Sequence, residues 1–287
     1  MMNSNPCSGR RLAIFFGAIA VHSQLFVQGF PSAVGGKPVA EMESLPSSSA
    51  HQPRQDIPDV LAKFSSGPLN QFLRIISTLP AGAAALDAVG KILTPLQQGL
   101  AESAGLETTA NDLERNSACA DITVIFARGT TEPGNLGLVT GPPFMDALKE
   151  RLGGRSLAVQ GVQYPATFAG FNRNGTDGVP SMTAFIDEAV SKCPNTKVVM
   201  SGYSQGALVV RSTADSLPID TMSKVNSVVT FGDPRNPSRI TGAGNKSLII
   251  CHENDAVCSG GFITIDHLTY AEDASGAAQF VMQRANA

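Results

Sequence analysis

The pentapeptide at residues 202–206, Gly-Tyr-Ser-Gln-Gly, is the part of the sequence that points most directly to chemistry. A Gly-x-Ser-x-Gly motif carries a nucleophilic serine when a sharp turn joins a strand to a helix, and the glycines are needed where the backbones crowd. Here an apolar strand pattern ends at Ser201 and a helical pattern covers 207–216. The setting predicts that Ser204 is a nucleophile at a helix N-terminus, where developing negative charge is favoured.

A serine nucleophile needs a base, and the chain has four histidines. Two of them, His22 and His51, lie in an N-terminal segment that is not expected to belong to the catalytic domain. Only His252 and His267 therefore remain as candidate bases.

Two acid and base sets follow Ser204 in the required order of nucleophile, acid and histidine. They are Asp255 with His267, and Asp233 with His252. The acid usually lies beyond the second strand after the nucleophile strand, and Asp255 meets that description better than Asp233. His252 would lie at a strand edge beside a cysteine, with little freedom to reach Ser204. Both sets stay open, but the order of elements favours Asp255 and His267.

The segment 127–137, Ala-Arg-Gly-Thr-Thr-Glu-Pro-Gly-Asn-Leu-Gly, follows the first strand of the predicted sheet. In a hydrolase of this type such a loop supplies one donor of the oxyanion hole. We expect that donor to be Thr130, whose hydroxyl could assist its N–H, and we expect the Gln205 N–H to be the second. A turn-rich linker is the alternative interpretation of the loop.

Apolar residues near these positions could hold an aliphatic acyl chain or lie against a waxy surface. Ordinary core packing is the alternative for each of them. The candidates are Leu136, Val139, Phe262, Ile263 and Ile265.

The elements that must position these residues alternate between strand and helix from Cys119 onward. Strands are predicted at 122–126, 157–162, 197–201, 225–231 and 247–250, and helices at 143–152, 181–192, 207–216 and 274–284. Continuous apolar strands indicate burial on both faces, and strand-helix alternation indicates parallel strands with right-handed crossovers. The predicted fold class is α/β, a three-layer α/β/α sandwich of the α/β-hydrolase type with a mostly parallel sheet of about five strands.

The N-terminal part has a different character. Residues 1–23 contain two arginines and then about ten uncharged apolar residues, which is too short to span a bilayer and typical of a signal peptide. Residues 24–55 are rich in Pro, Ser, Gly and Gln. Between 57 and 106 apolar residues recur at helical spacing, and the break at 80–82 predicts two or three short amphipathic helices.

These patterns divide the chain into a signal peptide at 1–23, an extension at 24–115 and a catalytic domain at 116–287. The helices of the extension could cap the core, act as a propeptide or cover the active site as a lid. The mature protein is expected to be extracellular.

Four cysteines follow the signal segment, which fits an oxidising compartment. Cys251 and Cys258 are close in sequence and favour a local bridge, which leaves Cys119 to pair with Cys193. The longer loop would stabilise the fold by roughly 4 kcal/mol in the chain-entropy model.

Composition limits the classes of partner. The formal net charge is −3, and no cluster of Lys and Arg could follow a phosphate backbone, so nucleic-acid binding is not expected. There is no second hydrophobic span and no metal-ligand cluster. We expect a monomer without a transmembrane segment that uses neither a metal nor an organic cofactor.

Three separated motifs together resemble the fungal cutinases. They are the loop 127–137, the segment Gly202-Tyr203-Ser204-Gln205-Gly206-Ala207, and Cys251-x3-Asp255-x2-Cys258 followed by His267-Leu268-Thr269-Tyr270. The resemblance covers residues 117–287. It departs at 258–267, which is about one residue shorter than usual, and in the long extension at 24–115.

The resemblance implies a compact α/β-hydrolase that hydrolyses cutin and short- to medium-chain esters. It implies the triad Ser204, Asp255 and His267, the oxyanion hole Thr130 and Gln205, and the bridges Cys119–Cys193 and Cys251–Cys258. The alternatives are an acetylxylan esterase on the same scaffold and a secreted surface-binding protein that keeps the fold without activity.

Overall fold

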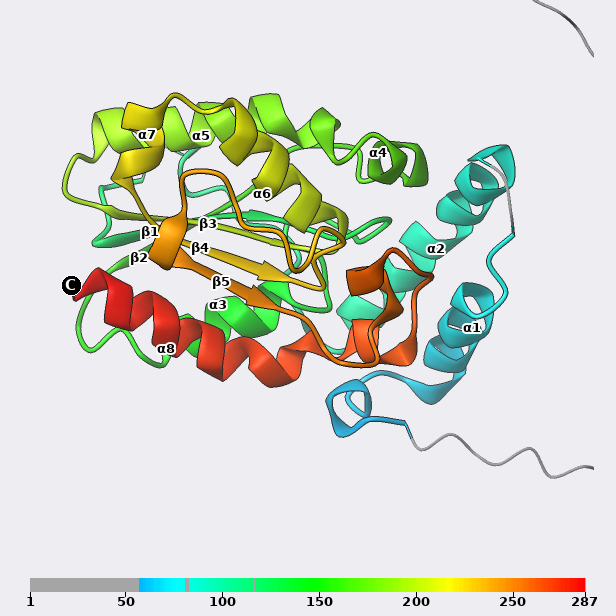
Figure 1. Cartoon of the computed structure of the whole chain (residues 1–287). Coiled ribbons are helices and arrows are strands. Elements are labelled where there is room, and N and C mark those ends of the chain that lie inside the picture. Colours follow the sequence, from blue (N-terminus) through cyan, green and yellow to red (C-terminus); the bar gives the residue numbers. More distant parts are fainter. Residues whose placement is uncertain (1–56, 81–82, 116, 287) are drawn as a thin grey trace, which may run out of the picture. The chain divides into compact units, whose positions relative to one another are not determined.

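A parallel sheet forms the centre of the computed structural model, which describes residues 57–80, 83–115 and 117–286 (Figure 1). Its strands are β1 (Ile122–Ala127), β2 (Leu157–Gly161), β3 (Lys197–Tyr203), β4 (Val225–Phe231) and β5 (Ser247–Ile250). Their spatial order is β2-β1-β3-β4-β5, and every neighbouring pair is parallel. From β1 the chain passes to β2 at one edge of the sheet, and from β3 it passes through β4 to β5 at the other edge. Functional sites in such sheets lie where the strand order reverses, here between β1 and β3.

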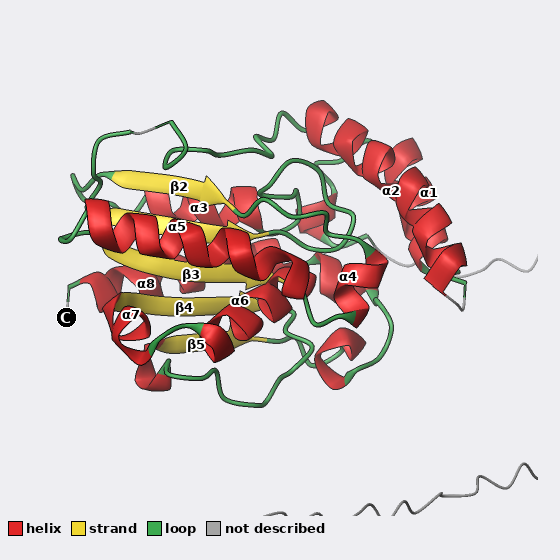
Figure 2. Cartoon of the chain, turned by 90° about the horizontal axis from the view of Figure 1, so that it is seen from above, coloured by secondary structure: helices red, strands yellow, loops and turns green. Residues whose placement is uncertain are grey.

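Helices cover both faces of the sheet (Figures 1 and 2). On one face α3 (Gly141–Lys149) packs on α8 (Ala274–Ala285), and on the other lie α5 (Val179–Lys192), α6 (Gln205–Ser216) and α7 (Ile219–Lys224). Strand β1 shows the reason, because Val124 and Phe126 belong to one buried cluster and Ile125 to the other. A strand buried on both faces needs apolar residues at every position.

Shorter elements complete the chain. Helix α4 covers Phe168–Asn172, and six 3-10 segments lie before or between the longer elements of the described residues. The 3-10 segments are Asp59–Leu61, Thr176–Gly178, Gly244–Lys246, Ala256–Ser259, Ile265–Leu268 and Tyr270–Asp273.

In the described part of the chain, two α-helices precede the sheet in sequence and pack against each other beyond the carboxyl ends of the strands (Figure 2). They are α1 (Ser66–Ile76) and α2 (Ala83–Ser103), and we call them the α1–α2 pair. The prediction of helices here is confirmed, but α2 is much longer than expected because it continues through Pro95. A proline inside a helix costs about 3 kcal/mol, and burial of Leu93 and Leu100 on either side offsets that cost.

The sandwich of parallel strands and flanking helices agrees with the predicted fold class. Helices α4 and α7 were not predicted, because five or six residues are too few to show a helical period. At the serine turn β3 continues to Tyr203 and α6 begins at Gln205, so that one residue joins them. The predicted signal peptide at 1–23 and the segment 24–56 lie outside the described residues. In the described part of the chain, no helix is long and apolar enough to cross a membrane.

Candidate active site

Ser204 alone forms the turn between β3 and α6, with φ 57° and ψ −118°. Residues other than glycine rarely adopt these backbone angles, so the turn is strained. The flanking glycines have steric reasons to be there. A Cβ on Gly202 would lie 2.3 Å from the Gly206 carbonyl oxygen, and one on Gly206 would lie 1.9 Å from the Ala127 carbonyl oxygen. The motif therefore lets α6 start directly against the end of β1.

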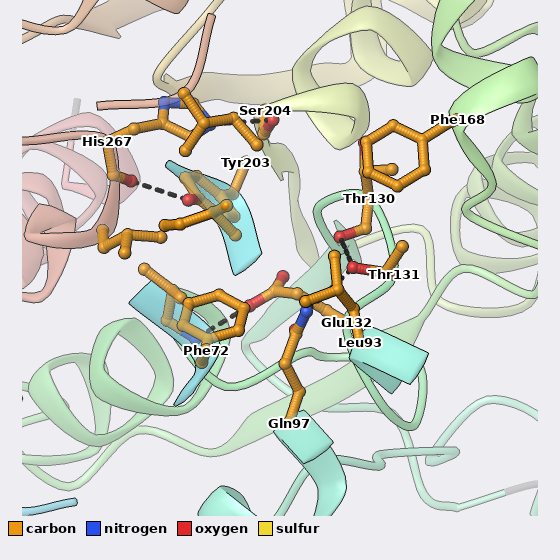
Figure 3. A pocket seen from close by; sticks show the side chains of 14 residues that line it. Phe72, Leu93, Gln97, Thr130, Thr131, Glu132, Phe168, Tyr203, Ser204 and His267 are labelled. Atoms are coloured by element: carbon orange, nitrogen blue, oxygen red, sulfur yellow. Dashed lines mark hydrogen bonds between the residues drawn. The ribbon is translucent and has the colours of Figure 1, made fainter. Parts of the chain in front are cut away.

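Ser204, His267 and Asp255 lie in one line of hydrogen bonds. The Ser204 Oγ is 2.9 Å from His267 Nε2, and His267 Nδ1 is 2.7 Å from Asp255 Oδ2 (Figure 3 shows the serine and histidine). All three side chains are at most 5 % exposed. A histidine whose Nδ1 faces a carboxylate keeps its proton there, which leaves Nε2 free to accept the serine proton.

The Asp255 carboxylate is held by its own loop. Its Oδ1 accepts the Val257 N–H at 3.0 Å, and a disulfide joins Cys251 to Cys258 on either side of it. Burial by itself would raise the pKa of Asp255, but hydrogen bonds and the charge of His267, together with the Tyr270 hydroxyl, hold that pKa below its usual value. The carboxylate therefore stays ionised beside the imidazole. The second disulfide joins Cys119 to Cys193, so both expected bridges are present.

The alternative acid and base set does not assemble. Asp233 is fully buried and forms an ion pair with Arg211, whose Nε lies 2.7 Å from Oδ2. His252 is half-buried and its Nε2 lies 2.6 Å from Asp273 Oδ2. Neither side chain contacts Ser204 in the described part of the chain.

The two expected oxyanion donors lie beside Ser204. The Thr130 hydroxyl donates to Gln205 Oε1 at 3.2 Å, which joins the loop after β1 to the start of α6. Neither the Thr130 N–H nor the Gln205 N–H has an acceptor among the described residues. The next residue, Thr131, has φ 64°, which is unusual for a β-branched residue, and its N–H donates to the Ala166 carbonyl at 2.7 Å.

The buried carboxylate of Glu132 holds this loop through hydrogen bonds to its backbone. It accepts the N–H of Gly129 at 2.7 Å, of Leu138 at 3.0 Å and of Val139 at 2.9 Å. Burial raises its pKa, while the three N–H donors act in the opposite direction. A Cβ on Gly137, at φ 75°, would lie 2.2 Å from Glu132 Oε2, so the glycine makes room for the carboxylate.

Two cavities meet at Ser204, and the α1–α2 pair covers both. The first has a volume of about 30 Å³ and is lined by Phe72, Ile76 and Leu93 of the pair as well as by His267 (Figure 3). The second has about 220 Å³ and is lined by Leu79 and Leu86 and by the loop 260–263. Ligand sites usually have roughly 300–1,000 Å³, and the smaller cavity has room for about one water.

Comparison with known proteins decides the family. The family model described as Cutinase matches residues 118–285, more than half of the chain. The chain belongs to the cutinase family. It is therefore a serine carboxylic ester hydrolase with the α/β-hydrolase fold.

Relatives of this cutinase-family chain support the assignment. A cutinase of Pyrenopeziza brassicae is 43 % identical over 203 residues, which are 70 % of this chain and 98 % of that protein. A cutinase of Botryotinia fuckeliana is 48 % identical over 171 residues, covering 58 % and 85 % respectively. The structure of Trichoderma reesei cutinase in complex with a C11Y4 phosphonate inhibitor superposes with a TM-score of 0.67 at 40 % identity, covering 76 % of this chain and 99 % of that one.

The apolar residues expected near the site of this cutinase-family chain divide into two groups. Val139, Ile263 and the exposed Phe262 line the cavities at Ser204. Leu136 instead lines a separate pocket beside α3, and Ile265 packs against the core. Their places depend on how the loops fold back, which spacing alone does not determine.

Several polar partners in the site were not expected from the sequence. The Tyr203 hydroxyl donates to the His267 carbonyl at 2.6 Å, Tyr270 contacts Asp255, and Gln97 contacts Thr131. Tyr203 and Tyr270 both lie inside the motifs that resemble the cutinases, and this was the one signal available for them. No group of His, Cys, Asp and Glu in the described residues could hold a metal ion.

Proposed function

We propose that this chain is a secreted carboxylic ester hydrolase that cleaves cutin and short- to medium-chain esters through Ser204, His267 and Asp255. The observation that carries the proposal is the line of two hydrogen bonds, 2.9 Å and 2.7 Å, from the Ser204 hydroxyl to the Asp255 carboxylate beside apolar cavities. The cutinase names of its relatives support the polyester as substrate. We further propose that the enzyme acts as a monomer.

The reaction is an acyl transfer in two steps. His267 Nε2 takes the Ser204 proton as Oγ attacks the ester carbonyl, and Asp255 holds the imidazole and stabilises its charged form. The Thr130 and Gln205 N–H groups bind the oxyanion, each contributing about 3 kcal/mol in comparable sites. His267 then protonates the leaving alcohol, and a water activated by the same nitrogen releases the acid from Ser204.

Export fits two features of the chain. Residues 1–23 have the composition of a signal peptide. The bridges Cys119–Cys193 and Cys251–Cys258 suit an oxidising compartment. N-terminal sequencing of the protein recovered from culture medium tests the cleavage after Ser23, and would also reveal removal of any part of 24–115.

The α1–α2 pair acts as a lid in this proposal. Its inner side chains Phe72, Ile76 and Leu93 are buried over the serine, and exposing each of them to water would cost about 1.5–3 kcal/mol. At a waxy surface the same side chains meet an apolar partner, so that cost disappears. Activity should therefore rise when an ester passes its solubility limit. A rate that saturates smoothly through that limit would contradict the lid.

The central experiment uses the purified full-length protein and a p-nitrophenyl phosphonate probe. We expect one equivalent of probe on Ser204, none in Ser204→Ala, and loss of ester turnover in the same variant. Absence of both labelling and turnover in the unmodified protein would support the non-catalytic alternative.

A substrate series separates the two enzymatic alternatives. The proposal expects faster hydrolysis of butyrate esters than of palmitate esters, and release of hydroxy fatty acids from cutin. Deacetylation of acetylated xylan that exceeds butyrate hydrolysis would favour the acetylxylan esterase.

A further inference from the structure

The Asp255 carboxylate has a second partner that the two-step reaction does not use. Its Oδ2 accepts the Tyr270 hydroxyl at 2.6 Å, and the same oxygen faces His267 Nδ1 at 2.7 Å. A carboxylate oxygen has two lone pairs. Tyr270 and His267 therefore occupy this oxygen completely, and the tyrosine determines which direction is left for the histidine.

The direction of the Tyr270 hydrogen bond is unambiguous. The hydroxyl oxygen accepts the His252 backbone N–H at 3.1 Å, so its own proton points elsewhere. An ionised carboxylate is only an acceptor, so the Tyr270 proton lies on the bond to Asp255. Burial, followed by this hydrogen bond, raises the pKa of Tyr270 well above that of a free phenol.

The Tyr270 ring is held from outside by a second histidine and carboxylate. The His252 ring stacks on it with 4.2 Å between centroids and 22° between planes. His252 Nε2 lies 2.6 Å from Asp273 Oδ2, and Nδ1 lies 3.1 Å from the Asp266 carbonyl oxygen. Thr269 Oγ1 also lies 3.1 Å from Nδ1. The titratable groups facing Tyr270 are thus Asp255, His252, Asp273, the edge of His267 at 6.0 Å, and Tyr203, whose ring centroid also lies 6.0 Å away.

We infer that Tyr270 is a positioning residue of the triad, held in place by the His252–Asp273 pair. Tyr270 is fully buried, and a phenylalanine would fill the same space without the cost of burying a hydroxyl. The hydroxyl serves two partners, the His252 N–H that it accepts and the Asp255 carboxylate to which it donates, and only the second belongs to the triad. The inference rests on the proposed function, since it gives a role to the acid of that triad.

The hydroxyl acts on Asp255 in two ways. It keeps the carboxylate aligned with the imidazole while His267 gains and loses its proton. It also takes part of the carboxylate's charge, which limits how tightly the charged imidazole is bound. Without the hydroxyl, Asp255 would bind the charged imidazole more strongly, which would favour the inactive, charged form of the triad at acidic pH.

The test compares Tyr270→Phe with Tyr203→Phe as a matched control. Tyr203 is also buried, packs on the same histidine ring at 5.0 Å, and donates to the His267 carbonyl rather than to Asp255. The measurements are kcat and KM for a soluble butyrate ester against pH, thermal unfolding, and phosphonate labelling to count active sites.

For Tyr270→Phe we expect kcat per labelled site to fall about tenfold with KM unchanged. The midpoint of the acid limb should rise by about 0.5–1 pH unit. Loss of a whole hydrogen bond to a charged group corresponds to about one to two units, and here the loss reaches the imidazole only through Asp255. In Tyr203→Phe the acid limb should keep its position. Asp273→Asn should move the limb in the same direction as Tyr270→Phe by a smaller amount, because it loosens the support and leaves the hydroxyl.

The results that overturn the inference are distinct from those that overturn the proposed function. If the unmodified protein is active and Tyr270→Phe lowers the unfolding temperature while kcat per labelled site and the midpoint of the acid limb stay unchanged, Tyr270 is merely structural. The role of the His252–Asp273 pair is contradicted if the acid limb of Asp273→Asn does not move. It is also contradicted if that limb moves in the opposite direction, or further than the limb of Tyr270→Phe. An unmodified protein without turnover and without labelling at Ser204 removes the triad and this inference together.

Discussion

Gln97 on the second helix of the α1–α2 pair donates a hydrogen bond from Nε2 to the hydroxyl of Thr131 at 2.8 Å. The Thr131 hydroxyl in turn donates to the Thr130 carbonyl at 2.6 Å, so a chain of two hydrogen bonds connects helix α2 to the loop 127–137 (Figure 3). Gln97 is 3 % exposed and lies among apolar neighbours. Gln97 thus forms a polar contact between the α1–α2 pair and the loop 127–137, beside the apolar side chains with which the pair covers Ser204.

Replacing Gln97 by Glu should weaken the covered state. The new carboxylate would be buried without a cation, which is costly above its pKa. We expect the rate on a soluble ester to rise several-fold near pH 8, and the ratio of emulsified to soluble rates to fall. Gln98→Glu is the control, because Gln98 lies on the same helix but bonds outward to Glu102. Equal rate profiles for the two variants would show that the Gln97–Thr131 hydrogen bond does not stabilise the covered state.

Glu132→Gln tests whether the buried carboxylate holds the loop 127–137, which carries the proposed oxyanion donor Thr130, in place. The amide has only one oxygen for three backbone N–H donors, and its NH₂ would face at least one of them. We expect a loss of about 1–3 kcal/mol in the free energy of unfolding and a fall in kcat of about 10- to 100-fold, because Thr130 shifts. Urea unfolding and ester kinetics measure both. Glu150→Gln, whose side chain is 75 % exposed, should change neither quantity.

The lowered pKa of Asp255 predicts an acid limit to stability. The folded carboxyl holds its proton less tightly than the unfolded one, whose pKa is about 3.9. Its contribution is therefore complete above that value and is lost as the pH falls through the lower folded pKa. The free energy of unfolding should fall as the pH drops from about 4 through the lower folded pKa, with a smaller slope in Asp255→Asn. Identical slopes, measured by urea unfolding, would contradict this role.

Two glycine substitutions should act in opposite directions. Gly206→Ala would place a Cβ 1.9 Å from the Ala127 carbonyl oxygen, so β1 and α6 must separate and ester turnover should be lost. Gly99→Ala meets nothing within 4 Å on an exposed face of α2, and alanine favours a helix by about 0.5–1 kcal/mol. Calorimetry should show a lower unfolding temperature for the first and a higher one for the second. A tolerated Gly206→Ala would mean that the serine turn is less tight than described.

The sequence by itself determined the order and type of the main elements. The apolar run 225–231 became a strand with those same bounds, because burial on both faces leaves a local pattern in the chain. The run 247–250 also kept its bounds and became the half-buried edge strand beside it. The serine turn was also predictable, since its steric demands fall on residues next to each other, Gly202 and Gly206. The order of elements favoured Asp255 and His267 over Asp233 and His252 without excluding the second set.

Only the tertiary structure decided which distant side chains meet. It brought Asp255 to His267 and gave Asp233 to Arg211, and it placed the α1–α2 pair over Ser204. The bonds from Tyr270 to Asp255, from Tyr203 to His267 and from Gln97 to Thr131 join residues 15, 64 and 34 positions apart. Such contacts depend on how loops and helices pack at the ends of the strands, and no periodicity or spacing in the chain records that packing.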